Sequence, residues 1–471
     1  MTLTIHPTKI YSPQDLQPEA VKTSPPGWVS REALYDRLNA LSAGGIIFLS
    51  SPNGSGKTTL IQSWLASLGQ ELPDSPQPVA TWLRLDPGDN DPVRFLAGII
   101  TSLNQVYPAL GASVLASLET PHPPDVTIEL TSLLAEITRL SETIILVLDD
   151  YETITASRIH QVMISLAVNC PQNLLLVLAC GADLPKDLET ARQRENWPVI
   201  GFQDLKLTAA EIEGFFEIYA QSGLSKIQLD IMLEHTQGLA LAVQLAALAA
   251  RRNPDPDHFW SSIEQHPATN LTYLVEQVLM RQMEPVREFL FCTSILSRLS
   301  GPLCDMVMRS SPSGMQASDR GRVTLEHCHK NHLFTTVLDP EHTWYRFHPE
   351  FARILSEELQ HRYPFLLPQL HQRASLWFEA NQDPESAIEH ALMAEDEDRV
   401  STLIELNILD LVATGQLSTA LTWLGKISAS RVLLRPWLSL AEAWAVAHEG
   451  WDQGARTGFR GTGSNARRKS A

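Results

Sequence analysis

The sequence has few cysteines, and their arrangement suggests neither a cross-linked protein nor a zinc site. Five cysteines are scattered through 471 residues without a CxxC pair, at Cys170, Cys180, Cys292, Cys304 and Cys328. An odd number without regular spacing argues against a disulfide framework. The chain also lacks a signal-peptide h-region and any apolar run of the roughly 18 to 20 residues that span a bilayer. We therefore expect a cytoplasmic protein with no membrane partner.

The sequence also has fewer basic than acidic residues. The chain has 36 Lys and Arg against 54 Asp and Glu, a formal net charge of −18. Such a molecule repels polyanions, so nucleic acid is not its default partner. The 44% hydrophobic content is that of a folded protein, and at roughly 150 residues per domain the length predicts about three domains.

The first part of the chain predicts an α/β domain with a parallel sheet. A polar arm over residues 1–27 is followed, within 28–204, by strand-length apolar runs that alternate with helical patterns: GIIFLS, VATWLRL, TIILVLDD, NLLLVLA and PVIGF. Runs that are apolar at every position are typical of strands buried on both faces of a parallel sheet. We expect a doubly wound domain here.

The rest of the chain predicts helical structure with one small β element. Residues 205–268 have helical spacing and predict a helical domain. Over 269–362, helices precede two β-like runs, HLFTTVLD and TWYRFH, which predicts a winged-helix domain. Residues 363–450 predict successive helix pairs of a TPR-like solenoid that is incomplete, and 451–471 predict a disordered basic tail.

A phosphate-binding loop is predicted between the first strand and its helix. In SPNGSGKTT, residues Gly56, Lys57 and Thr58 fill the end of the GxxxxGK[ST] motif, and Ser51 stands where Gly or Ala is usual. Amides from Gly54 onward can point at phosphate oxygens, Lys57 can reach the β- and γ-phosphates, and the Thr58 hydroxyl can bind Mg²⁺. The predicted ATP or ADP contacts are Asn53, Gly54, Ser55, Gly56, Lys57, Thr58 and Thr59. The alternative is a plain strand-to-helix turn with coincidental glycines.

An acidic pair ends the strand IILVLDD. Asp149 is expected to hold Mg²⁺ together with Thr58, and Asp150 to orient or deprotonate the attacking water. Asp150 and Lys57 are thus the candidate catalytic residues. Two carboxylates after a strand are otherwise often only a turn.

Several stretches together resemble the signal-transduction ATPases with numerous domains (STAND), in particular the MalT-like, LuxR-type transcriptional regulators. They include SPNGSGKTTLIQSWL, VATWLRLDPGDNDPVRF, IILVLDDYETI, TQGLALAVQLAAL and WYRFHPEFARIL. The resemblance implies an AAA/NACHT-like P-loop domain, an ADP-bound closed form, and an ATP form that self-associates after a small-molecule or protein inducer binds the helical repeats. Slow ATP hydrolysis would reset this switch.

The resemblance also implies roles for three residues outside the loop. Val29 and Arg31, in WVSRE, match the segment that contacts adenine, with a plain helix start as the alternative. His348, in WYRFHP, matches the winged-helix histidine that reaches the β-phosphate of ADP; a packed core histidine is the alternative.

Three features depart from that family. Cys180, Gly181 and Ala182 stand where an arginine usually senses the γ-phosphate, so we expect impaired hydrolysis. The stretch from Gly238 to Ala240 lacks a usual proline. The chain stops at Ala471 without the LuxR-type helix-turn-helix, so direct DNA binding is not expected.

Three hypotheses follow for the function. The leading one is an ATP/ADP-binding switch with slow or impaired hydrolysis and no DNA-reading domain of its own. The others are a working ATPase or phosphotransferase, and a truncated scaffold whose repeats bind proteins while the nucleotide is structural. A metal site at His327, Cys328, His329 and His332 is disfavoured, because these side chains do not share one helix face.

Overall fold

The computed structural model describes residues 10–11, 29, 31–41, 44–71, 78–120, 124–181, 183–251, 253, 255–265, 271–309, 320–339, 341–413 and 417–444. Within this part of the chain, every helix is too short or too polar to cross a membrane. The predicted basic tail and most of the N-terminal arm lie outside it.

Five of the six strands in the main sheet are parallel, as the apolar runs predict. They are β2 (Gly45–Ser50), β3 (Val79–Arg84), β4 (Ile144–Asp149), β5 (Leu174–Cys180) and β6 (Val199–Gly201). Their order in the sheet is β3-β4-β5-β2-β6, so β5 lies between the strand that leads into the loop and the strand that carries the acidic pair. Every residue of β4 and β5 is buried, since helices cover both faces.

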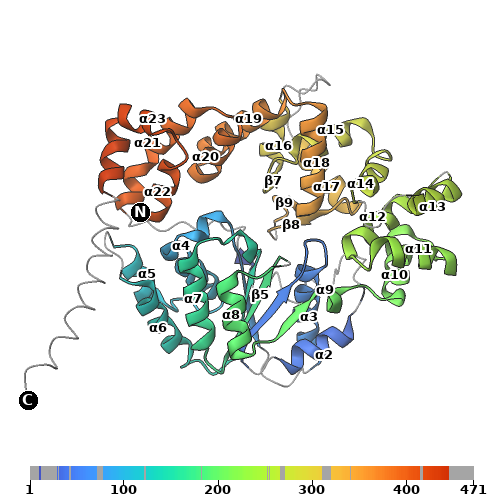
Figure 1. Cartoon of the computed structure of the whole chain (residues 1–471), viewed down its shortest axis with the longest axis horizontal. Coiled ribbons are helices and arrows are strands. Elements are labelled where there is room, and N and C mark those ends of the chain that lie inside the picture. The colour runs from blue at the N-terminus through green and yellow to red at the C-terminus, as the bar shows by residue number, and fades with distance from the viewer. Residues whose placement is uncertain are drawn as a thin grey trace, which may run out of the picture.

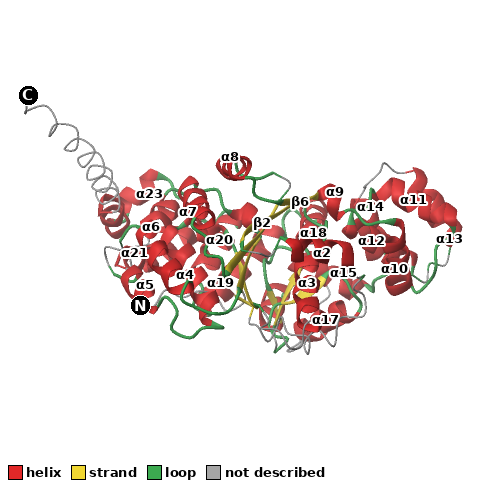
Figure 2. Ribbon diagram, turned by 90° about the horizontal axis from the view of Figure 1, so that it is seen from below, coloured by secondary structure: helices red, strands yellow, loops and turns green. Residues whose placement is uncertain are grey.

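Alternate side chains of the strands pack into two separate hydrophobic cores, one on each face of the sheet. Ile47 and Leu49 of β2 pack with α2 (Glu32–Ala40) and α3 (Lys57–Glu71), whereas Ile46 and Phe48 face the other layer. That layer contains α4 (Pro92–Asn104), α5 (Ala112–Leu118), α6 (Val126–Ile137), α7 (Ser157–Val168) and α8 (Lys186–Glu195). Figure 2 shows the sheet with helices on either side.

The N-terminal arm contributes a strand that the sequence analysis does not predict. Residues Ile10–Tyr11 form β1, which pairs antiparallel with the edge strand β3 through Ile10↔Leu83 and Tyr11↔Trp82. An edge strand can be extended by backbone hydrogen bonds alone, so a polar arm can pair there without an apolar pattern of its own.

A group of helices follows β6. It comprises α9 (Phe202–Leu205), α10 (Ala209–Phe215), a π-helical turn η4 (Phe216–Ala220), α11 (Lys226–Thr236), α12 (Ala240–Ala250) and α13 (Pro256–Gln265). Thr208 and Glu211 form a reciprocal capping box that starts α10, and Ser225 and Gln228 do the same for α11.

A winged helix follows. Its helices are α14 (Leu271–Leu279), α15 (Glu284–Thr293), α16 (Gly301–Met308), α17 (Arg320–Lys330) and α18 (Pro349–Arg362). The two β-like runs form the antiparallel pair β8 (Thr335–Val337) and β9 (Trp344–Phe347), and a third strand, β7 (Leu299–Ser300), pairs with β9. A strand of two residues is too short to show an alternating apolar pattern, so the sequence does not predict β7.

The last described elements are antiparallel helices: α19 (Leu367–Ala380), α20 (Pro384–Met393), α21 (Glu397–Ala413), α22 (Leu417–Leu424) and α23 (Ala429–Leu434). Figure 1 shows α20 to α23 beside α4 and α5, and the winged helix above the sheet. Leu338, between β8 and β9, is buried in the same core as Leu49 of β2. The winged helix is therefore packed directly on the sheet domain, which brings its residues to the site.

Candidate nucleotide-binding site

The loop between β2 and α3 has the backbone of an anion cradle. Gly54 and Gly56 have φ values of +85° and +90°, a region that L side chains rarely adopt. A Cβ on Gly54 would lie 2.8 Å from the Cβ of Leu241, so this position accepts only glycine. The hydroxyls of Ser51 and Ser55 are buried and have no hydrogen-bond partner among the described residues. Such orphaned donors and a tight glycine loop fit a site built for phosphate.

Lys57 begins α3 and turns its ammonium back over the loop. Its Nζ donates to the carbonyl of Ser51 over 2.6 Å, and it lies 3.4 Å from both the carbonyl of Pro52 and the Oδ1 of Asn53. The residue is 8% exposed. A buried cation that is bonded only to neutral oxygens has no compensating anion in those contacts, and a phosphate would provide one.

Thr58 and Asp149 meet across the strand that separates them. The Thr58 hydroxyl donates to Oδ2 of Asp149 over 3.1 Å, with β5 lying between β2 and β4 in the sheet. Burial, together with the neighbouring Asp150 carboxylate, raises the pKa of Asp149 to about 6. A hydroxyl and a buried carboxylate at this separation are the oxygen ligands that Mg²⁺ prefers, and its charge would favour the ionised carboxylate.

Asp150 follows β4 in the left-handed region, with φ +57°. Its Oδ2 accepts a hydrogen bond from Nη1 of Arg346 over 2.7 Å, and Nε of Arg84 lies 3.3 Å from the same oxygen. Burial alone would raise the pKa of Asp150, but the guanidinium groups of Arg346 and Arg84 outweigh it and lower that pKa. Asp150 is thus a carboxylate held by two cations.

His348 joins the site from the winged helix. Its backbone N–H donates to the carbonyl of Phe334 over 2.8 Å, and its imidazole is half-buried with Nδ1 lacking a partner among the described residues. Burial, reinforced by the positive charges of Arg346 and Lys57, lowers the pKa of His348 to about 4. A neutral imidazole close enough to Lys57 to feel its charge can donate one hydrogen bond to a phosphate oxygen.

Val29 and Arg31 lie against α10. The Arg31 guanidinium donates to Oε1 of Glu211 over 2.8 Å and to the carbonyls of Leu205 and Lys206 over 3.0 Å and 2.9 Å. A Cβ on Gly214 would lie 3.5 Å from a methyl of Val29. The side chain of Arg31 therefore holds the N-terminal segment to the helical group, and adenine contact by these two residues stays a prediction.

The helical group is attached to the loop by its backbone. The N–H of Leu241 donates to the carbonyl of Gly54 over 2.9 Å, and Gly238, with φ +73°, ends the preceding turn. Helix α12 begins at Ala240, directly after Gly238 and Leu239. Ala240 also lies near Gly56, whose added Cβ would be 3.7 Å away.

Sequence reasoning missed the two arginines on Asp150 and a bridge made by Asn90. Arg84 and Arg346 both lie in quoted motifs, but nothing local shows that they converge. Asn90, in the short helix η2 (Pro87–Asn90), donates to the carbonyl of Thr153 and accepts from the N–H groups of Thr155 and Ala156. It thereby fixes the segment that follows Asp150.

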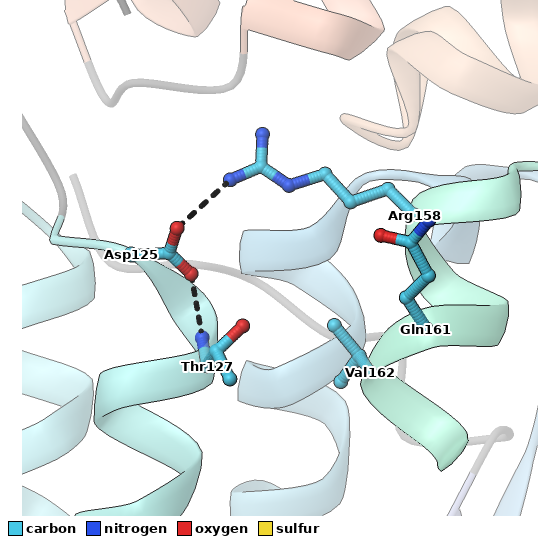
Figure 3. Close-up of a pocket in the computed structure, with 5 residues that line it drawn as sticks. All are labelled: Asp125, Thr127, Arg158, Gln161 and Val162. Atoms are coloured by element: carbon cyan, nitrogen blue, oxygen red, sulfur yellow. Dashed lines mark hydrogen bonds and ion pairs between the residues drawn. The ribbon is translucent and has the colours of Figure 1, made fainter. Parts of the chain in front are cut away.

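The other positions that the sequence analysis singled out lie outside the nucleotide-binding loop and the acidic pair. Gly181, at the end of β5, accepts a hydrogen bond from Ser50 Oγ over 3.0 Å, and Ala182 lies outside the described residues. His327, Cys328, His329 and His332 form no group that could hold a metal ion in the described part of the chain. A surface hollow at the start of α6 and α7 is lined by Asp125, Thr127, Arg158, Gln161 and Val162 (Figure 3), none of them a residue of the loop or the acidic pair.

Comparisons with known proteins point to one group. Residues 275–367 match the family model of the MalT winged helix domain. The HTH-type transcriptional regulator MalT of Cronobacter sakazakii is 28% identical over 423 residues, which are 89% of this chain and 45% of that protein. The serine/threonine-protein kinase PknK of Mycobacterium tuberculosis is 28% identical over 417 residues, 88% of this chain and 36% of that protein. The chain thus spans less than half the length of these relatives.

A solved structure shows the same fold. A STAND protein with a tetratricopeptide repeat sensor, PH0952 from Pyrococcus horikoshii, superposes with a TM-score of 0.60 at 13% identity, covering 90% of this chain and 56% of that one. The fold is that of a multidomain protein with a P-loop-type parallel sheet, a helical part, a winged helix and helical repeats. These findings confirm the resemblance of the chain to MalT-like STAND P-loop ATPases.

Proposed function

We propose that this chain is an ATP/ADP-binding signal-transduction switch, related to the ATPase and sensor part of MalT-like regulators. The observation that carries the proposal is the contact between Thr58 and Asp149, 3.1 Å apart at the rim of the glycine loop. A loop of amides, a lysine, a hydroxyl and a buried carboxylate in this arrangement are what binding of Mg²⁺ and a nucleoside triphosphate requires.

Each residue has a defined task in this proposal. Amides of Asn53 to Thr59 cradle the phosphates, and Lys57 exchanges its bonds with loop carbonyls for phosphate oxygens. Thr58 and Asp149 hold Mg²⁺, which supplies charge neutralisation when bound. Asp150 orients or accepts a proton from water. The nucleotide base is assigned to the segment around Val29 and Arg31, next to α10.

The arrangement of domains supports a closed, ADP-favouring form. Helix α12 is bonded to the loop through Gly54. The winged helix places Arg346 on Asp150 and brings His348 within the electrostatic reach of Lys57. ATP must favour another arrangement, since a ligand shifts an equilibrium only by its differential affinity. His348 would then release the phosphates as the winged helix departs.

Hydrolysis is expected to be slow in this form. Cys180, which ends β5, and Gly181, which follows it, offer no cation to a γ-phosphate, and Asp150 is engaged by Arg346. We infer a regulator that turns over rarely and responds to an inducer on its helical repeats, with self-association in the ATP form. DNA reading is assigned to no described element, because the winged-helix segment has more acidic than basic residues.

The test is equilibrium binding of ATP and ADP to the native chain and to Lys57→Ala, with phosphate release followed in parallel. Loss of the lysine should weaken affinity by roughly ten- to a hundredfold, because a charge-assisted phosphate contact is lost. Lys330→Ala, at an exposed helix position, is the matched control and should leave affinity unchanged. Equal affinity of Lys57→Ala and the native chain would remove this loop from the site.

A second candidate function is protein binding by the helical repeats. Large apolar side chains are exposed on the last described helices, including Leu433 at 77%, Leu434 at 81% and Trp437 at 54%. Exposed apolar clusters of this kind often mark protein contacts. Sedimentation of the chain with and without ATP measures whether this face drives self-association independently of nucleotide.

A further inference from the structure

Two arginines from different domains contact one carboxylate oxygen of Asp150. Arg346 Nη1 lies 2.7 Å from Oδ2 and Arg84 Nε lies 3.3 Å from it. The side chains of Arg84, Arg346 and Asp150 are 15%, 25% and 20% exposed. Because water is largely kept away from these charges, each contact affects Asp150 more than a surface ion pair would.

The two arginines are held by different parts of the molecule. Arg84 ends β3 and lies in register with Asp149, and the N–H of the next residue, Leu85, donates to the carbonyl of Asp149 over 3.0 Å. Arg84 is therefore fixed to the strand that carries the acidic pair. Arg346 lies in β9, whose partners in the described part of the chain are the winged-helix strands β7 and β8. Arg346 therefore belongs to the winged helix and not to the parallel sheet.

Arg84 is also unusual among the strand ends. The five parallel strands end at Ser50, Arg84, Asp149, Cys180 and Gly201, so Arg84 is the one cation among these terminal residues. The carboxyl ends of parallel strands line the edge where ligands bind in such sheets. A positive charge anchored in the parallel sheet thus lies beside Asp150 at this edge.

We propose that Arg84 is a positioning residue for ATP hydrolysis and that Arg346 withholds Asp150 from the reaction in the closed form. This inference rests on the proposed function. In hydrolysis the oxygen of one water bonds to the terminal phosphorus, its proton passes to Asp150, the bridging P–O bond breaks, and ADP and phosphate leave. Arg84 keeps the carboxylate aimed at that water. Arg346 makes the shorter contact with Oδ2, 2.7 Å against 3.3 Å for Arg84, and competes with the water for this oxygen until the winged helix departs.

The two arginines therefore have opposite effects although they carry the same charge. If both acted only as positive charge near the phosphates, removing either would change the rate in the same direction. Under the proposal, losing Arg84 slows hydrolysis, and losing Arg346 accelerates it.

The experiment compares the full chain with Arg84→Gln, Arg84→Lys and Arg346→Gln. The kcat and KM for Mg-ATP are measured by phosphate release, with single-turnover assays at excess protein where steady turnover is slow. Arg84→Gln should lower kcat by roughly tenfold with KM changed less than about twofold, and Arg346→Gln should raise kcat by at least about threefold. Arg84→Lys should recover most of the lost rate, because it restores the charge beside Oδ2.

Arg194→Gln, on an exposed helix, is the matched control for loss of an arginine and should leave kcat unchanged. Thermal unfolding of every variant checks that it is folded. If Arg84→Gln is not, Arg346→Gln against the native chain carries the comparison, and a kcat that is unchanged or lower overturns the inference. Rates that shift in the same direction for Arg84→Gln and Arg346→Gln overturn the inference, as does an effect of Arg84→Gln on KM alone. Failure of the native chain to bind ATP or ADP would instead defeat the proposed function.

Discussion

The backbone N–H of Leu241 donates to the carbonyl of Gly54 over 2.9 Å, so that helix α12 and the phosphate-binding loop share a hydrogen bond. The Leu241 side chain also leaves no room for a side chain on Gly54, because a Cβ added there would lie 2.8 Å from the Cβ of Leu241. The loop and the helical group are therefore one mechanical unit in this form. This contact is a route by which a change in the loop could reach α12, which is the kind of coupling that a nucleotide switch needs.

The glycine at this contact gives the first prediction. Gly54→Ala should weaken ADP affinity by at least about tenfold, because it adds a methyl group against Leu241 at a φ of +85° that alanine avoids. The measurement is fluorescence titration with a labelled ADP. Gly223→Ala is the matched control, since a Cβ there meets nothing within 4 Å. Equal losses in the two variants would mean that the cradle geometry is irrelevant to binding.

The hydroxyl of Thr58 gives a second prediction. Thr58→Val keeps the shape but removes the oxygen that lies 3.1 Å from Asp149. We expect the gain in ATP affinity on adding Mg²⁺ to fall by roughly tenfold, because one metal ligand is lost, while affinity in EDTA stays unchanged. Thr190→Val, whose hydroxyl bonds only within its own exposed helix, serves as the comparison. An unaltered Mg²⁺ dependence would contradict the assignment.

His348 should distinguish ADP from ATP. In the closed form the neutral imidazole can donate one hydrogen bond to a phosphate. His348→Phe removes this donor. ADP dissociation measured by stopped flow should become faster by roughly tenfold, with a smaller effect on ATP. His361→Phe, at an exposed position of α18, should release both nucleotides at native rates. Equal acceleration for ATP and ADP would argue for a purely structural histidine.

A buried histidine pair predicts how stability depends on pH. Nδ1 of His371 and Nδ1 of His390 are 2.8 Å apart between α19 and α20. Burial lowers the pKa of His371 to about 4, and burial together with the neighbouring ring lowers that of His390 to about 3. The unfolded state, with a histidine pKa near 6.5, therefore binds more protons below neutral pH.

The sign follows from that difference. Stability is highest above about pH 7 and falls as the pH drops toward about 4, by roughly 2 to 3 kcal/mol for each histidine. The urea midpoint of the repeat helices, followed by tryptophan fluorescence, measures this loss. His390→Asn should flatten the dependence, whereas His361→Asn should preserve it. A midpoint that rises on acidification would show that the pair is not buried as a neutral unit.

Much of the fold could be predicted because it rests on local patterns. The residues at 46–49, 144–148 and 174–180 are apolar throughout, and such runs form parallel strands whose following polar residues lie at the carboxyl edge. This is why Thr58 and Asp149 could be expected to meet. The helical spacing over 205–268 likewise predicts helices, and the structure shows that α10 and α11 start at capping boxes with Thr208 and Ser225.

What could not be predicted depends on contacts between distant residues. Arg31 is held by Glu211, 180 positions away, and Arg346 by Asp150, 196 positions away. A local sequence pattern does not indicate which face of the winged helix packs on the sheet. The sequence therefore could not predict that Arg84 and Arg346 meet at Asp150. The strand at Ile10–Tyr11 forms because the edge strand β3 offers unpaired backbone groups, and its own composition does not predict it.

The most direct test of the central claim is amide hydrogen exchange of the native chain with and without saturating Mg-ADP. The account predicts slower exchange in residues 53–59, at the start of α12 and around His348, where the loop, helical group and winged helix enclose the phosphates. Exchange that is unchanged over residues 53–59 while ADP is bound elsewhere would contradict it.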